Sequence, residues 1–413
     1  MNMNAQKTMT ACFIAYIVQA IVNNLAPLLF VTFQKTYNIP LSEITILITA
    51  NFLIQLLVDA LAAMVVDRIG YRASTLIAHG SCALGLVLLA FLPEVLPNPF
   101  LGLLAAVAVY AVGGGLIEVL VSPIIEACPT DNKEKAMSLL HSFYCWGQMG
   151  VVLLSTIYFS LAGLQNWKLL VLLWSLVPMM NLFLFAKVPL YALKTEDGQT
   201  LTLKALFSKS IFWVLMLMMV CAGASEQAVS QWASTFAEQG LGVSKTIGDL
   251  AGPMAFAALM GTSRLIYGKY GDRIHLDSFM KYSCLLCILS YGAIALVPIP
   301  MVGLIGCAVC GFSVGILWPA TFSKASKAMK GGSTALFALL ALAGDFGCSA
   351  GPSLAGFVSS QFQNNLHLGI LGAIVFPVLL WIGMLALQKL EAAPSQETNL
   401  KPCLEPADLQ ANS

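Results

Sequence analysis

The sequence predicts an all-α membrane protein with twelve transmembrane helices in two pseudo-symmetric six-helix bundles. Of its 413 residues, 58% are hydrophobic and 10% are charged, whereas soluble domains carry about a quarter charged residues. About twelve apolar segments have the roughly 20 residues that a helix needs to cross a bilayer. Two similar charged turns, at 67–72 and 268–273, place their Asp-Arg pairs 205 positions apart (272 minus 67), which indicates that one six-helix unit occurs twice.

The apolar segments divide the chain into an N-terminal bundle (1–187), a linker (188–208), a C-terminal bundle (209–390) and a polar tail (391–413) that we expect to be disordered. No small-residue cleavage site follows the first apolar segment, so it is interpreted as a retained helix. The predicted spans are 9–33, 43–66, 73–92, 100–126, 136–161, 166–187, 209–237, 247–268, 277–298, 300–322, 332–358 and 366–388.

The distribution of cations predicts the orientation in the membrane. The side that carries both termini and both charged turns holds 18 of the 21 Lys and Arg residues, and the other side holds Lys35, Lys168 and Lys245. Under the positive-inside rule, this asymmetry places both termini in the cytoplasm. We therefore expect a multi-pass protein of the plasma membrane.

The chain lacks the residues that several classes of function require. The net charge of +1 gives no basic surface for nucleic acid. The sequence contains no phosphate-binding Gly-x-x-x-x-Gly-Lys-Ser/Thr loop, no Gly-x-Ser-x-Gly nucleophile motif and no His-rich metal set. Its eleven cysteines are scattered through apolar segments, which is typical of packing residues. We expect neither enzymatic activity nor a cofactor.

The charged turns resemble the signature of the major facilitator superfamily of secondary transporters, Gly-x-x-x-Asp-Arg-x-Gly-Arg-Arg. The matching stretch is 63–72, with Ala63 for the first Gly and Tyr71 for one Arg, and the second copy keeps Gly268 but has His275 in place of the later Gly. The resemblance covers nearly the whole chain and implies a monomer working by alternating access. It assigns a cytoplasmic gate to Asp67, Arg68, Arg72, Asp272 and Arg273.

Two further stretches, 140–147 and 344–352, are similar to the fucose permease-like branch of that superfamily, which contains fucose/proton symporters. In the second stretch, Gly347 and Gly351 have the spacing that lets helices approach closely, and Pro352 permits a bend. We interpret this run as a packing or hinge element.

Ionisable residues inside the predicted spans are the candidates for mechanism, because each costs roughly 3 kcal/mol there on insertion scales. Glu118, Glu226 and Asp345 all fall near mid-bilayer. Glu118 is the first candidate for carrying a proton, and the alternative is a Glu neutralised by a hydrogen bond to another helix. Asp345 and His141 are further proton-coupling candidates, and His141 either couples to Glu118 or bonds to a carbonyl.

Polar and aromatic side chains near the same depth are candidates for substrate binding. Glu and Gln exchange hydrogen bonds with hydroxyl groups, and Trp stacks on a ring face, while amides in the first helix either line the pathway or join helices. Gln19 shares a face with Asn23 at i,i+4 spacing. The candidates are Asn23, Asn24, Tyr144, Glu226, Gln227, Gln231, Trp232 and Trp318.

Asp59 and Arg264 lie at equivalent positions in the two halves, eight residues before each charged pair. Opposite charges there predict either a bridge between the halves or separate pairs with loop residues, and we favour a structural role at the gate over substrate binding. Asp249, near the outer end of its helix, is expected to be solvated.

Together these observations predict a transporter that imports a small hydroxylated, sugar-like solute by proton symport, with sodium as the other possible coupling ion. One alternative is a proton-coupled exporter of drug-like or organic-anion compounds. Another is a membrane sensor that transports nothing.

Overall fold

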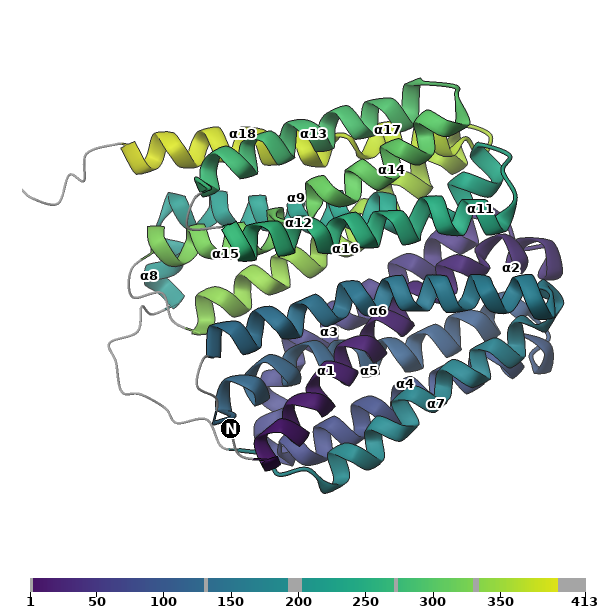
Figure 1. The fold of residues 1–413 in the computed structure, drawn as a ribbon, viewed down its shortest axis with the longest axis horizontal. Helices are drawn as coiled ribbons and strands as arrows, with labels where there is room; N and C mark the ends of the chain where they lie inside the picture. Colours follow the sequence, from purple (N-terminus) through teal and green to yellow (C-terminus); the bar gives the residue numbers. More distant parts are fainter. Residues whose placement is uncertain (1–2, 130–132, 192–202, 271–273, 330–333, 393–413) are drawn as a thin grey trace, which may run out of the picture.

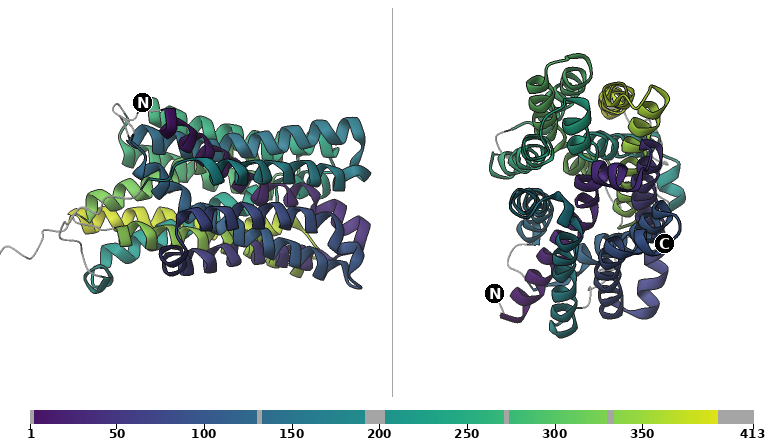
Figure 2. Two further views of the ribbon diagram at one scale, coloured as in Figure 1. Left: turned by 90° about the horizontal axis from the view of Figure 1, so that it is seen from below. Right: turned by 90° about the vertical axis from the view of Figure 1, so that its right-hand side faces the viewer.

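The computed structural model describes residues 3–129, 133–191, 203–270, 274–329 and 334–392, and these residues form helices joined by short turns. Figure 1 shows two groups of helices, α1–α7 below and α9–α18 above, with the N-terminus and α8 at the left. Seen along the helices, the two groups remain separate bodies that meet along one face (Figure 2, right). We call them the N half and the C half, the left end in Figure 1 the terminal side, and the other end the opposite side.

The N half contains six spanning segments, of which the first is broken by a 3-10 turn. Its elements are α1 (Met3–Asn24), η1 (Ala26–Leu29), α2 (Phe30–Tyr37), α3 (Leu41–Ile69), α4 (Tyr71–Val95), α5 (Pro99–Ala127), α6 (Lys133–Ala162), η2 (Leu164–Asn166) and α7 (Trp167–Lys187).

The C half repeats this plan after α8 (Leu203–Phe207), which lies within the predicted linker 188–208. Its elements are α9 (Ser210–Ser230), α10 (Ala233–Thr235), η3 (Phe236–Gly240), α11 (Lys245–Asp249), η4 (Leu250–Met254), α12 (Ala255–Tyr270), α13 (Leu276–Leu296), α14 (Pro300–Val314), α15 (Leu317–Ala328), α16 (Thr334–Gln361), α17 (Leu366–Ala373) and α18 (Val375–Ala392).

All twelve predicted spans correspond to helical segments. Ten segments among the described residues are long and apolar enough to cross a membrane. The other two predicted spans, 247–268 and 332–358, correspond to α11–η4–α12 and α16. The predicted tail, 391–413, lies almost entirely outside the described residues.

Glycines let the helices within each half approach closely. A Cβ on Gly113 of α5 would lie 2.4 Å from the Ala78 carbonyl oxygen of α4. In α16, Cβ atoms on Gly347 and Gly351 would lie 2.0 and 2.3 Å from carbonyl oxygens of α9. Real Cβ atoms do not fit at such distances, so the packing interpretation of the Gly347-x-x-x-Gly351 run is confirmed.

Proline interrupts the first spanning segment toward its opposite-side end. Pro27 lies in η1, between α1 and α2, and its missing N–H ends the regular hydrogen bonding of the helix. The break leaves backbone carbonyls that need other donors, since lipid offers none. One of these carbonyls, that of Leu28, receives its donor from the C half: the Lys245 Nζ lies 2.6 Å away.

Candidate functional site

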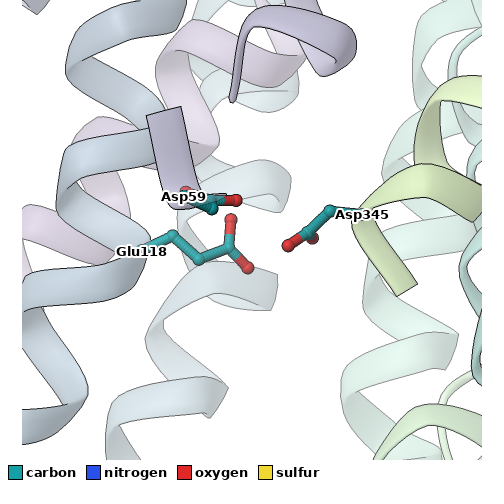
Figure 3. Close-up of side chains that lie close together, drawn as sticks. All are labelled: Asp59, Glu118 and Asp345. Carbon is teal, nitrogen blue, oxygen red and sulfur yellow. The ribbon is translucent and has the colours of Figure 1, made fainter. Parts of the chain in front are cut away.

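Three carboxyl groups meet between the two halves. Asp59 on α3, Glu118 on α5 and Asp345 on α16 each place one oxygen within 4.8 Å of the others (Figure 3). They lie nine to eleven residues from the helix ends on the terminal side, or about 13 to 17 Å at 1.5 Å per residue, which is near the middle of a roughly 30 Å hydrocarbon layer. We call these three residues the carboxylate cluster.

The first helix supplies the polar neighbours of the carboxylate cluster. Gln19 donates from Nε2 to Glu118 Oε2 at 2.6 Å. One turn earlier, the Tyr16 hydroxyl lies 3.5 Å from that of Ser122, on the helix that carries Glu118. Glu118 therefore has the interhelical hydrogen bond that the sequence left as an alternative, and it also belongs to the cluster.

Asp59 and Arg264 do not bridge the halves to one another in the described structure. Both carboxylate oxygens of Asp59 are inaccessible to solvent and accept no hydrogen bond from a described residue. Arg264 instead pairs with Glu226 at 3.5 Å and donates to the Gly315 carbonyl oxygen at 3.0 Å. Its Nη1 also reaches across to the Cys145 sulfur of the N half, 3.1 Å away. Neither predicted arrangement is seen, because the partners of Arg264 are Glu226 on α9, Cys145 on α6 and Gly315 at the end of α14, and none of them belongs to the charged turns.

A chain of amides runs through the middle of the molecule beside the carboxylate cluster. In the N half, Gln55 Nε2 donates to Asn23 Oδ1 at 2.8 Å. Asn23 offers its backbone oxygen to Gln231 of the C half at 3.2 Å, and Gln231 also donates to Gln227 at 3.0 Å. Gln227 reaches Glu226 at 3.3 Å. The structure thus brings four predicted substrate-binding residues into one hydrogen-bonded path between the halves.

The remaining predicted polar residues lie on α1 and α6. Asn24 approaches the Tyr144 hydroxyl at 3.5 Å while bonding to its own helix. His141 is exposed, and its ring centroid lies 5.4 Å from that of Tyr16. It makes no contact with Glu118 among the bonds of the described residues, although Tyr16 lies beside both.

The two predicted tryptophans lie in the C half, and the ring of Trp232 also packs against Phe30 of the N half, with centroids 5.9 Å apart. Trp232 is fully buried and donates its indole N–H to the Pro352 carbonyl at 2.9 Å, so this N–H is occupied in the state described. Trp318 is half-buried and lies against Gly344, where a Cβ would meet its ring at 2.2 Å. It therefore packs against α16, the helix that carries Asp345.

The gate residues of the charged turns are only partly described. Arg72 binds the end of α7 within the N half, donating to the carbonyl oxygens of Phe185, Ala186 and Val188, each at 2.8 Å. Arg68 is exposed. Asp272, Arg273 and the side chain of Asp67 lie outside the described residues.

Asp249 is buried, so the expectation that it is solvated was wrong. It accepts hydrogen bonds from Ser234 at 2.5 Å and Lys245 at 3.2 Å, and Lys245 also reaches Leu28 of the N half. The sequence shows the i,i+4 spacing of Lys245 and Asp249, but the freed carbonyl that draws Lys245 inward depends on tertiary packing.

The halves are joined mainly toward the opposite side. Besides Lys245 and Leu28, Lys35 pairs with Glu238 at 2.9 Å, and the Thr49 and Ser353 hydroxyls lie 2.5 Å apart. In the described part of the chain, hydrogen bonds between the halves lie from about mid-depth to this side. The carboxylate cluster lies near the terminal-side limit of this bonded zone.

Sequence reasoning missed three polar residues of the site. Asn51 and Gln55, one turn apart on α3, both bind Asn23, and Gln148 of α6 donates to Ser230 of α9 at 3.0 Å. The sequence could have indicated them, because Asn and Gln side chains inside the predicted spans 43–66 and 136–161 need hydrogen-bond partners there.

A sequence model of the Major Facilitator Superfamily matches residues 9–352. No curated protein sequence matches the chain. Among solved structures, it is similar to a bacterial homolog of the human lysosomal transporter Spinster in an inward-facing, occupied conformation, with a TM-score of 0.76, 14% identity, and coverage of 94% of this chain and 98% of that one. It is also similar to the Escherichia coli fucose:proton symporter FucP, with a TM-score of 0.64, 15% identity and coverage of 92% and 98%. These likenesses show a shared fold, and the family match establishes that the chain belongs to the major facilitator superfamily.

Proposed function

We propose that this secondary transporter imports a small hydroxylated, sugar-like solute by proton symport, as in the fucose permease-like branch. The observation that carries the proposal is the carboxylate cluster, which takes Asp59 and Glu118 from one half and Asp345 from the other. Like charges this close repel, so the cluster needs positive charge among its oxygens, and protons can supply it. Movement of the halves would change which side of the membrane exchanges those protons.

The amide path beside the cluster supports a polar, uncharged cargo. Asn23, Gln227 and Gln231 offer both donors and acceptors at mid-depth, as hydroxyl groups require. Glu226 is paired with Arg264, so this pair presents no net charge to a solute. A neutral solute with several hydroxyl groups fits this chemistry better than an organic anion.

The experiment that tests this function measures transport by the purified protein in liposomes. A thermal-shift screen with a solute panel first finds a stabilising solute. Adding that solute outside vesicles is expected to make the external medium more alkaline, because protons enter with it. External acidification on solute entry would contradict symport.

Two conservative variants test the assignment of roles. Glu118→Gln is expected to abolish the pH dependence of transport, because an amide does not ionise in the physiological pH range. Glu226→Gln is expected to abolish stabilisation by the solute. If both variants behave like the parent protein, the assigned residues are not the site.

One observation favours a second candidate, proton-coupled export of drug-like compounds. Aromatic rings gather near Tyr16, where Phe13 stacks on Phe143 with centroids 4.6 Å apart and Phe143 packs against the exposed Trp146. Such rings suit flat apolar solutes. Efflux of a dye against its gradient, with protons moving the opposite way, would favour this candidate over the first.

A further inference from the structure

We propose that the carboxylate cluster, when ionised, binds one Na⁺ ion through Asp59, Glu118, Asp345 and the side-chain oxygen of Gln19. The proposal rests on the proposed function, because an ion bound by residues of both halves would be bound and released as the halves move during transport. In it, Na⁺ and protons occupy the same oxygens in turn.

The spacing of the carboxyl oxygens suits an ion of this size. Ca²⁺, whose ionic radius is close to that of Na⁺, takes oxygen ligands at about 2.4 Å, so two ligands on opposite sides lie at most about 4.8 Å apart. The three cluster oxygens all fall within 4.8 Å of one another. One ion placed among them can therefore touch a carboxylate from each of α3, α5 and α16.

Gln19 gives an independent indication of a ligand. Its side chain is 2% exposed, and its Nε2 is fixed on Glu118 at 2.6 Å. The other amide atom, Oε1, is buried beside the same carboxylate and has no hydrogen-bond donor. A buried carbonyl oxygen without a partner is costly, and a cation at the cluster would give this oxygen its partner.

The protein side chains do not neutralise the cluster. Among the ion pairs of the described residues, none brings Lys or Arg onto Asp59, Glu118 or Asp345. Arg264, a half-buried cation of the site, is engaged by Glu226, Gly315 and Cys145. Within the described residues the cluster thus has no protein cation, and the proposal assigns its positive charge to protons or to an ion from outside.

The need for release favours Na⁺ over divalent ions. Mg²⁺ demands near-ideal octahedral geometry and keeps several waters, and Ca²⁺ can take carboxylates in mono- or bidentate fashion, so the number of oxygens alone does not select the ion. Three carboxylates attract a divalent ion more strongly than Na⁺, whereas an ion released on each transport cycle has to be held weakly.

The test measures the melting temperature of the purified full-length protein in detergent at fixed pH 8. NaCl is compared with N-methyl-D-glucamine chloride at equal ionic strength, and KCl, CaCl₂ and MnCl₂ form further arms. We expect NaCl to raise the melting temperature by at least about 2 °C in a saturable way, because the ion binds the folded state. No difference between Na⁺ and N-methyl-D-glucamine, an equal effect of K⁺, or stabilisation by Ca²⁺ or Mn²⁺ alone would each overturn the proposal.

Asp345→Asn and Gln19→Leu are expected to lose the Na⁺ effect. The matched control is Asp277→Asn, which removes a carboxylate that pairs with Lys324 at 2.8 Å, away from the cluster, and should keep it. Retention of ²²Na⁺ by each purified variant provides a second measurement if a substitution alters stability itself. Equal ²²Na⁺ binding by Asp345→Asn and the parent would contradict the site.

Different experimental results would disprove the transport function and the Na⁺ site. Proton symport measured in Na⁺-free vesicles can succeed while Na⁺ binding is absent. Conversely, Na⁺ binding without any solute movement would leave the ion site in place and remove the transport assignment.

Discussion

Arg264 and Glu226 form an ion pair that is largely removed from water. Their side chains are 19% and 10% exposed, and removing one partner of a buried pair costs about 3 to 5 kcal/mol because the other charge stays buried. The Lys168–Glu94 pair, with 32% and 53% exposure, provides the contrast, since exposed pairs contribute about 0 to 1 kcal/mol.

We therefore predict that Arg264→Leu destabilises the protein by about 3 kcal/mol. Adding Glu226→Leu to that variant should recover much of the loss, since no unpaired charge remains. Thermal unfolding in detergent, followed by tryptophan fluorescence, measures both effects. Lys168→Leu serves as the control and should change stability by less than about 1 kcal/mol; a double variant no more stable than Arg264→Leu would argue against the pair.

At the scale of elements, α3 and α16 make a close contact between the halves. A Cβ built on Gly356 of α16 would lie 2.3 Å from the Thr45 hydroxyl oxygen of α3. Thr45 is buried and bonded to its own helix at 3.0 Å, so it has little room to move. A glycine at position 356 thus permits the halves to touch toward the opposite side.

Gly356→Ala is predicted to separate α3 from α16 and shift the protein toward opening at the opposite side. Spin labels on the exposed residues Val95 and Leu296, in a cysteine-depleted background, would report a longer distance between the halves. Gly150→Ala is the matched control, because a Cβ there meets nothing within 4 Å. Unchanged distances in Gly356→Ala would show that the contact yields without moving the halves.

The spans were predictable from sequence because lipid imposes a length and a composition on every crossing helix. Glu118 and Asp345 were likewise found by their depth. Asp59 was assigned to the gate because it and Arg264 carry opposite charges at equivalent positions of the two halves, and only tertiary packing shows that it lies beside Glu118. The burial of Asp249 also depends on packing, since its partner Lys245 is drawn inward by the Leu28 carbonyl.

For the whole molecule, the cation distribution predicts one orientation in the membrane. Lys35, Lys168 and Lys245 all lie at the ends of helical segments on the opposite side, while the predicted order of spans assigns the other 18 Lys and Arg residues to the side of the termini. A green fluorescent protein fused after Ser413 is expected to fluoresce, and alkaline phosphatase fused there is expected to be inactive, since both termini should be cytoplasmic. Active alkaline phosphatase at that position would show that the C-terminus lies outside the cytoplasm, which contradicts the predicted orientation.

The carboxylate cluster has two members on one half and one on the other, and this unequal division has a thermodynamic consequence. A proton or cation that contacts all three carboxylates binds best to the conformation in which the two halves bring them together. Its concentration therefore shifts the equilibrium between conformations. Linkage then works in reverse: a solute that favours the same arrangement must tighten binding of that species by the same factor by which the species tightens binding of the solute. One pair of affinity measurements, each made with and without the other ligand, would give the coupling free energy of the transporter.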